Sequence, residues 1–399
     1  MTARDWANFD WFALTKFQPP RLREDVISRP RLLATAYEAL VSHPVTLLSA
    51  PAGYGKTTLL AELAQSLSDL STSSCIDDDR RAVQGLLLAW LSLEEEDNDP
   101  THFLSALVAS LRRADPKCGA TAQSVISSLS TPSRDSRRVV GVLINDVVET
   151  VLGPLVLVLE DLHFISEAEV YGALDYLIER MPPQMRLMIT SRHDPPLSLA
   201  RLRARGQLAE LRLADLRFSL DETGAFLNEK QRLELGSADL VALHSRAEGW
   251  PAGLRLLAGS LGRMASVTDR SAFVRHLART DRHVFDFLAD EVLKRQESEM
   301  RAFLLETSIL PELTPALCQA VTGRSDASVV LEELNRRNLF LVALDEVSSA
   351  YRFHALFAEF LRERLAREMP GRIADLHRRA AEAERHVAPM RAIPHYLAG

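Results

Sequence analysis

Residues 45–60 have the types and the order that binding a phosphate chain requires. An aliphatic and β-branched run, suited to a buried strand, is followed by a loop with two glycines and then by apolar residues at helical spacing. Gly53 and Gly55 let backbone N–H groups approach an anionic oxygen. Lys56 can reach the β- and γ-phosphates, and the Thr57 hydroxyl can ligate Mg²⁺.

One position of this loop departs from the usual GxxxxGK[ST] pattern, because Ala50 replaces the first glycine. A small residue still fits there, since the last four positions carry the phosphate chemistry. The alternative is a glycine-rich turn that happens to precede a helix. With strand, loop and helix in register, the sequence favours a nucleotide-binding loop. The residues expected to contact the nucleotide are Ala52, Gly53, Tyr54, Gly55, Lys56, Thr57 and Thr58.

A second informative stretch, residues 154–161, is an almost purely aliphatic strand that ends in Glu160 and Asp161. This is the Walker B arrangement, in which one carboxylate holds the Mg²⁺ shell while its neighbour polarises the attacking water. Thr57 and Glu160 are therefore the expected metal ligands. An apolar run capped by acids is common, but here it follows the phosphate loop at a spacing normal for P-loop domains. Glu160 stands where Asp is usual, which puts efficient hydrolysis in doubt.

Two further stretches place an arginine near the expected site. Arg192 follows a strand expected at 186–190, where its guanidinium can read a γ-phosphate. A salt bridge at the strand end is an equally good interpretation. Upstream of the loop, Val26 and Ile27 beside Arg29 can hold an adenine and touch a phosphate. The alternative is a strand-like lead-in with a solvent-facing arginine.

The alternation of strands and helices predicts an α/β P-loop domain with one parallel, doubly wound sheet. Beyond about residue 205 the strand signals fade and helices dominate. Residues 302–365 give helix, helix, hairpin and helix, which is the outline of a winged helix. The strands of the sheet are expected at 45–49, 86–93, 154–159 and 186–190.

We expect five segments along the chain. They are an N-terminal arm and adenine-side lead-in (1–40), a P-loop nucleotide-binding domain (41–205), an all-α helical domain (206–285), a winged-helix domain (286–368) and the start of an α-superhelical sensor arm (369–399). The last segment holds two short helices without a terminal cap, so we expect the chain to be a fragment of a longer protein.

Composition limits the classes of protein to consider. A chain of 399 residues with 47% hydrophobic and 25% charged residues is globular and too long for one ordinary core. A net charge of −7 argues against a dedicated nucleic-acid binder. Cys75, Cys118 and Cys318 are far apart and next to no histidine cluster, which indicates reduced thiols in a cytoplasmic protein. The sequence has no signal peptide and no run able to span a bilayer, so no membrane partner is expected.

Taken together, the motifs resemble the N-terminal half of the MalT-like regulators. These are large ATP-binding LuxR-type transcription factors within the STAND class of P-loop ATPases. Their modules are a nucleotide-binding domain, a helical domain, a winged helix, a superhelical sensor arm and a C-terminal helix-turn-helix. The last is absent from this chain and the arm is only begun. The matching motifs are residues 19–22, 26–29, 49–58, 90–93, 159–163, 190–192, 248–254 and 353–357.

The resemblance implies roles for residues far apart in the sequence. Adenine contacts would come from Val26, Ile27 and Pro251, phosphate sensing from Arg29 and Arg192, and an approach to the β-phosphate of ADP from His354. The residues that would serve hydrolysis are Lys56, Glu160, Asp161 and Arg192. From the residues alone, His354 is more often a satisfied core histidine. The break at 249–251 is more often a simple helix terminus.

The preferred hypothesis is a signal-transduction switch driven by ATP or ADP with Mg²⁺. ADP would bridge the nucleotide-binding domain and the winged helix in a closed monomer, whereas ATP and an inducer on the sensor arm would favour an open, self-associating form. Slow ATP hydrolysis would reset the switch. DNA contact is expected only through the helix-turn-helix that lies outside this chain.

Two other functions remain open. In the first, the winged helix itself reads DNA, with Arg336 and Arg337 on a helix as its best support. Acidic neighbours Glu332 and Glu333 and the net charge weaken this hypothesis. In the second, the chain is a stand-alone P-loop ATPase.

Overall fold

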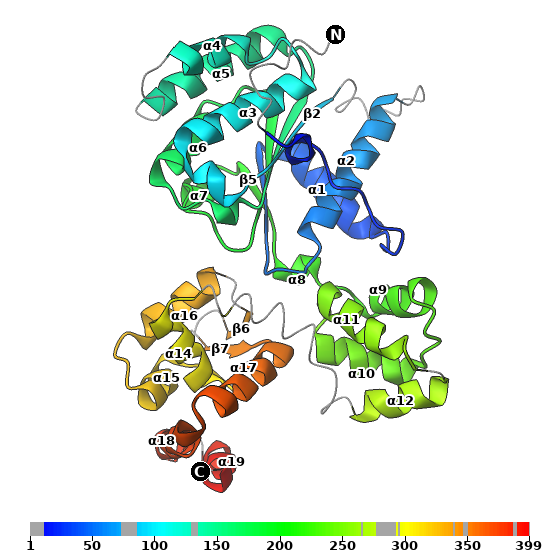
Figure 1. The fold of residues 1–399 in the computed structure, drawn as a ribbon, viewed down its shortest axis with the longest axis vertical. Coiled ribbons are helices and arrows are strands. Elements are labelled where there is room, and N and C mark those ends of the chain that lie inside the picture. Colours follow the sequence, from blue (N-terminus) through cyan, green and yellow to red (C-terminus); the bar gives the residue numbers. More distant parts are fainter. Residues whose placement is uncertain are drawn as a thin grey trace. The chain divides into compact units, whose positions relative to one another are not determined.

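The computed structural model describes residues 12–72, 86–128, 135–264, 266–276, 293, 296–337, 340–345, 350–385 and 389–398. The chain divides into two compact units, Met1–Leu216 and Arg217–Gly399. Figure 1 shows that the first unit is built on a sheet and that the second is mostly helical. Cys75 falls outside the described residues, as do residues 338–339 and 346–349 within the predicted winged helix.

Five parallel strands form the sheet of the first unit, in the order β2-β3-β4-β1-β5. This confirms the predicted parallel sheet. The strands are β1 (Val45–Ser49), β2 (Leu87–Ser92), β3 (Leu155–Glu160), β4 (Met185–Ser191) and β5 (Leu208–Leu211). β5 was not among the predicted strands of the sheet, because the strand signals fade beyond about residue 205. β5 is a short edge strand that is mostly half-buried, so it lacks the continuous apolar run of the central strands.

Helices cover both faces of this sheet, which explains why β1 and β3 are buried along their whole length. Alternate strand residues face opposite cores: Val45 and Leu47 belong to the core that also holds Phe103 and Leu143. Figure 1 shows α3, α5 and α6 on one side of the sheet and α1 and α2 on the other. The helices of this unit are α1 (Pro30–Ser42), α2 (Lys56–Thr72), α3 (Pro100–Ala114), α4 (Ala120–Ser128), α5 (Ser136–Thr150), α6 (Ala168–Glu179), α7 (Leu199–Ala204) and α8 (Leu213–Leu216).

The acidic run after β2 is only partly a solvated loop. Glu94, Glu95 and Glu96 are exposed, but Asp97 is fully buried. The Lys16 ammonium, itself buried, donates to the Asp97 carboxylate at 2.7 Å. A buried charge is tolerated when it is paired, so this ion pair fixes the chain before α1 to the turn that follows β2.

In the described part of the second unit, helices precede and follow a single hairpin. The antiparallel hairpin β6/β7 follows α14, α15 and α16 and precedes α17, so the predicted hairpin and final helix are confirmed, with three helices before the hairpin where two were predicted. Helices α18 and α19 pack against each other at the chain's end. The elements are α9 (Leu220–Gly224), α10 (Ser237–Ala247), α11 (Pro251–Leu261), α12 (Val267–His276), α14 (Ser298–Thr307), α15 (Pro315–Thr322), α16 (Ala327–Arg336), β6 (Leu341–Asp345), β7 (Ala350–Phe353), α17 (Ala355–Glu368), α18 (Ile373–Glu384) and α19 (Pro389–Ala398).

The break between α10 and α11 is a helix terminus built on left-handed backbone. Glu248 and Gly249 have φ of 49° and 66°, which ends α10, and Pro251 starts α11. The N–H of Phe218 donates to the Gly249 carbonyl at 2.8 Å. Trp250 is fully buried, in edge-to-face contact with the His354 ring. This terminus therefore packs against the first residue after the hairpin.

We predict that Gly249→Ala destabilises the protein, because its Cβ would lie 2.5 Å from the Phe218 carbonyl oxygen at a positive φ. The expected loss in the free energy of unfolding is about 1–3 kcal/mol. The matched control is Gly259→Ala inside α11, where an added Cβ has no heavy atom within 4 Å. It should gain about 0.5–1 kcal/mol. Urea unfolding followed by circular dichroism measures the free energy of unfolding of both variants. Equal effects of the two changes would contradict a specific need for glycine at position 249.

Candidate functional site

The loop between β1 and α2 has the backbone that the sequence predicted. Gly53 and Gly55 have φ of 80° and 79°, a left-handed conformation that a side chain disfavours. At Gly55 no heavy atom lies within 4 Å of an added Cβ, so the backbone angle alone selects glycine there. α2 begins at Lys56, directly after the loop. The loop therefore leads into a helix N-terminus, where N–H groups favour an anion.

The Lys56 side chain folds back over this loop. Its ammonium donates to the carbonyl oxygens of Ala50 at 2.6 Å and Pro51 at 3.0 Å, and the residue is only 7% exposed. Burial lowers the pKa of Lys56 to about 8, although the nearby carboxylate of Asp161 opposes this shift. An ammonium has three N–H donors. Two neutral carbonyls leave the third donor and the positive charge for an anion, so the site fits a phosphate.

The two acids at the end of β3 have different surroundings. Glu160 is buried and accepts a hydrogen bond from the Ser92 hydroxyl at 2.7 Å, which in turn accepts from the Trp90 indole N–H at 3.0 Å. Asp161 has a φ of 59°, and its N–H donates to the Thr190 hydroxyl at 2.8 Å. Burial and the charge of Glu160 raise the pKa of Asp161. The raised pKa makes Asp161 a stronger proton acceptor than an ordinary aspartate.

Four predicted hydrolysis residues gather at the carboxyl edge of the sheet. The charges of Glu160, Asp161 and Arg192 all act on Lys56. Among the described residues, no carboxylate lies within ion-pair distance of Arg192, so the salt-bridge interpretation finds no support there. Thr57 and Thr58 lie in the first turn of α2. Ser92 was not among the predicted site residues, because only the pairing of β2 with β3 brings it beside Glu160.

The lead-in residues lie elsewhere in the first unit. Ile27 is buried and Val26 is half-buried. The Arg29 guanidinium donates to the carbonyl oxygens of Leu216 at 3.0 Å and Asp215 at 3.5 Å. Arg29 therefore holds the last residues of this unit, and its contact with a phosphate stays a prediction.

The remaining predicted contacts belong to the second unit. Pro251 is the first residue of α11. His354 is 1% exposed, and its Nε2 lies 3.1 Å from the Ala247 carbonyl. Its Nδ1 has no hydrogen-bond partner among the described residues. Burial lowers the pKa of His354. The ring is a core histidine satisfied at only one of its two nitrogens.

Sheet, loop and acid pair together define a P-loop ATPase fold. The Walker-type ATPase of Pyrococcus abyssi shares this fold, with a TM-score of 0.55 at 15% identity over 86% of this chain and 98% of that chain. A P-loop ATPase fold implies nucleotide binding. Among the described residues, no helix is long and apolar enough to cross a membrane.

The sequence relatives narrow this class. The model of the MalT winged helix domain matches residues 289–373. The HTH-type transcriptional regulator MalT of Yersinia enterocolitica is 35% identical over 96% of this chain and 40% of its own length. The serine/threonine-protein kinase PknK of Mycobacterium tuberculosis is 33% identical over 92% of this chain and 31% of its own. The chain is thus similar to these proteins over most of its own length, and it spans less than half of theirs.

We predict that nucleotide affinity falls as pH rises above about 8. In the free protein Lys56 loses its proton near that pH, and a bound phosphate would raise its pKa, so binding takes up a proton. The dissociation constant should be flat below pH 7 and should rise about tenfold per pH unit well above 8. Calorimetry in buffers of different ionisation enthalpy measures both affinity and proton uptake.

Lys56→Ala should abolish binding in the same assay. The matched control is Lys117→Ala, which removes an exposed lysine of the same unit and should bind normally. Retained binding by Lys56→Ala would overturn the assignment of the site.

Proposed function

We propose that the chain is the nucleotide-driven switch module of a transcriptional regulator. ATP or ADP binds with Mg²⁺ at the loop, ADP holds a closed resting state, and ATP with an inducer favours an open form that self-associates. The observation that carries this proposal is the buried Lys56 ammonium, which has only two loop carbonyls as hydrogen-bond acceptors among the described residues.

The two relatives favour a role in receiving a signal over a role in producing the regulator's or the kinase's output. One is named as a transcriptional regulator and another as a protein kinase, yet the same segment aligns with both. A segment shared by proteins with different outputs is best explained as the part that receives a signal. We propose that contact with DNA and with the inducer occurs outside this segment.

We propose that the predicted hydrolysis residues hydrolyse bound ATP slowly and thereby return the switch to its ADP-bound state. Thr57 and Glu160 would hold Mg²⁺, which would neutralise charge on the phosphates. Asp161, whose pKa is raised, would polarise the attacking water. Glu160 is already engaged by the Ser92 hydroxyl, and Arg192 would neutralise charge on the γ-phosphate.

His354 would add the contact that makes ADP a closing ligand. The Ala247 carbonyl can only accept, so Nε2 carries a hydrogen and Nδ1 of the neutral ring is an acceptor. Nδ1 can donate to a phosphate only when the imidazole is protonated. A β-phosphate placed there would offset the burial that lowers the pKa of His354.

The structure weakens the hypothesis that the winged helix reads DNA. Arg336 and Arg337, its best support, both pair with the Glu333 carboxylate. Their charges are thereby partly neutralised within one helix turn. Salt-dependent DNA binding by this chain would revive the hypothesis, and rapid ATP turnover without a partner would favour a stand-alone ATPase.

Mass spectrometry of the nucleotide released from purified protein tests the proposal. We expect ADP in near-stoichiometric amount. If stripped protein shows no calorimetric binding of either adenine nucleotide, the proposed function is wrong.

We predict that His354→Ala accelerates ADP dissociation about tenfold, the loss of one charge-assisted hydrogen bond. In the wild type, ADP should dissociate more slowly as pH falls, because protonation of the ring favours the contact. Stopped-flow chase of a fluorescent ADP measures the rate. His43→Ala, at the end of α1, is the control and should leave the rate unchanged. An unaltered rate in His354→Ala would remove this contact from the proposal.

A further inference from the structure

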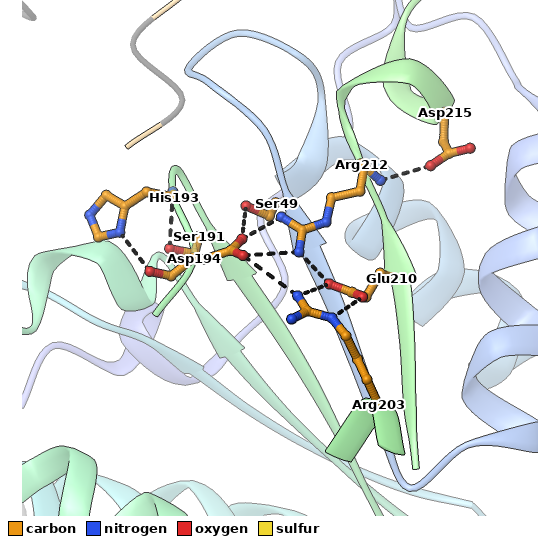
Figure 2. Close-up of polar contacts among 8 residues, drawn as sticks. All are labelled: Ser49, Ser191, His193, Asp194, Arg203, Glu210, Arg212 and Asp215. Carbon is orange, nitrogen blue, oxygen red and sulfur yellow. Dashed lines mark hydrogen bonds and ion pairs between the residues drawn. The ribbon is translucent and has the colours of Figure 1, made fainter. Parts of the chain in front are cut away.

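A cluster of four charged side chains lies between the end of β4 and the edge strand β5. It consists of Asp194, Arg203, Glu210 and Arg212, and Figure 2 shows Arg212 between the two carboxylates. Arg212 pairs with both Asp194 and Glu210. Arg203 binds Glu210 through two nitrogens, at 2.8 and 2.9 Å, and lies 3.6 Å from Asp194. Two acids and two bases make the charged cluster neutral.

One side of the charged cluster is fixed to the phosphate loop. The Ser49 hydroxyl, at the end of β1, donates to Asp194 at 3.3 Å. The Ala50 N–H donates to the Ser191 carbonyl at 3.3 Å, and the His193 N–H donates to the Ser191 hydroxyl at 3.3 Å. Residues 191–194, the turn after β4, therefore connect the base of the loop to Asp194 and also carry Arg192.

The other side is fixed to the end of the first unit. The Arg212 N–H donates to the Asp215 carboxylate at 2.8 Å, and the Arg212 carbonyl accepts from Asp215 and Leu216 at 3.0 and 3.1 Å. Arg29 holds the carbonyls of the same two residues. Residues 212–216, the linker, are thus held by two arginines immediately before the second unit begins at Arg217.

We propose that the ion pair between Asp194 and Arg212 makes the position of the linker depend on whether a γ-phosphate is bound. The inference rests on the proposed function and assigns Asp194 and Arg212 as positioning residues. Only His193 separates Arg192 from Asp194, so movement of Arg192 towards a γ-phosphate displaces the Asp194 carboxylate. Arg212 is then held by Glu210 alone, and the linker that Arg212 binds through Asp215 changes position.

In this proposal Arg212 has two arrangements, one paired with both carboxylates and one paired with Glu210 alone. Hydrogen bonding from Arg203 is the main cause that lowers the pKa of Glu210 to about 2, so this partner stays charged. Arg212 keeps Glu210 as a partner when Asp194 moves away. Exposed ion pairs contribute little singly, but a change of partner within a network can bias a two-state element.

Hydrogen exchange tests the inference in the whole chain. The amides of residues 212–216 are compared with ADP bound and with a non-hydrolysable ATP analogue bound. We expect their protection to differ at least fivefold between the two nucleotides. Asp194→Asn and Arg212→Gln should each abolish that difference while nucleotide affinity stays within threefold. The double variant should behave like each single variant, because every one of them removes the same Asp194–Arg212 ion pair.

Matched variants separate this effect from a loss of stability. Glu179→Gln breaks the exposed pair of Glu179 with Arg201, which lies outside the charged cluster, and should keep the difference. Arg212→Lys keeps the charge and should restore at least half of it, even where Arg212→Gln fails to fold. A wild type that binds both nucleotides with identical protection at 212–216 would overturn this inference alone. The inference would also be overturned if folded Asp194→Asn kept the full difference in protection between the two nucleotides. A wild type that binds neither nucleotide would overturn the proposed function first.

Discussion

The burial of one ammonium group is the constraint on which the site depends. Lys56 holds its charge in a region that lowers its pKa, against two carbonyl dipoles of its own loop. Removing a cation from water is costly unless an anion compensates. Gly53 and Gly55 hold a left-handed backbone that other residues adopt only with strain. A phosphate bound beside the ammonium would supply the compensating charge.

Much of the sheet could be predicted because its central strands are buried on both faces. β1 appears in the sequence as an aliphatic and β-branched run, and β3 as an aliphatic run that ends in Glu160. β5 could not be predicted in this way, since an edge strand contacts the core along one side and carries Glu210. Asp97 was equally hidden, because its partner Lys16 lies 81 residues earlier and no local pattern links them.

The functional site likewise combines features with a local sequence pattern and contacts between residues far apart in the sequence. Glycine, lysine and threonine at fixed offsets indicate the phosphate loop, since their roles are local to one turn. The hydrogen bond from Ser92 to Glu160 and the pairing of Asp194 with Arg212 depend on which strands are neighbours. Strand order is set by the packing of the whole sheet, and a single sequence does not encode it in any local period. Contacts across strands were therefore the part that required coordinates.

Each unit also carries a buried indole beside a group that we expect to respond to nucleotide. Trp90 donates to the hydroxyl that holds Glu160, and the Trp250 ring lies edge-on to His354 at 5.9 Å between centroids. Indole emission is sensitive to a neighbouring proton and to local field. Among the described residues these two indoles are intrinsic optical probes, one in each unit, and the single replacements Trp90→Phe and Trp250→Phe separate their emission from each other and from that of Trp6 and Trp11.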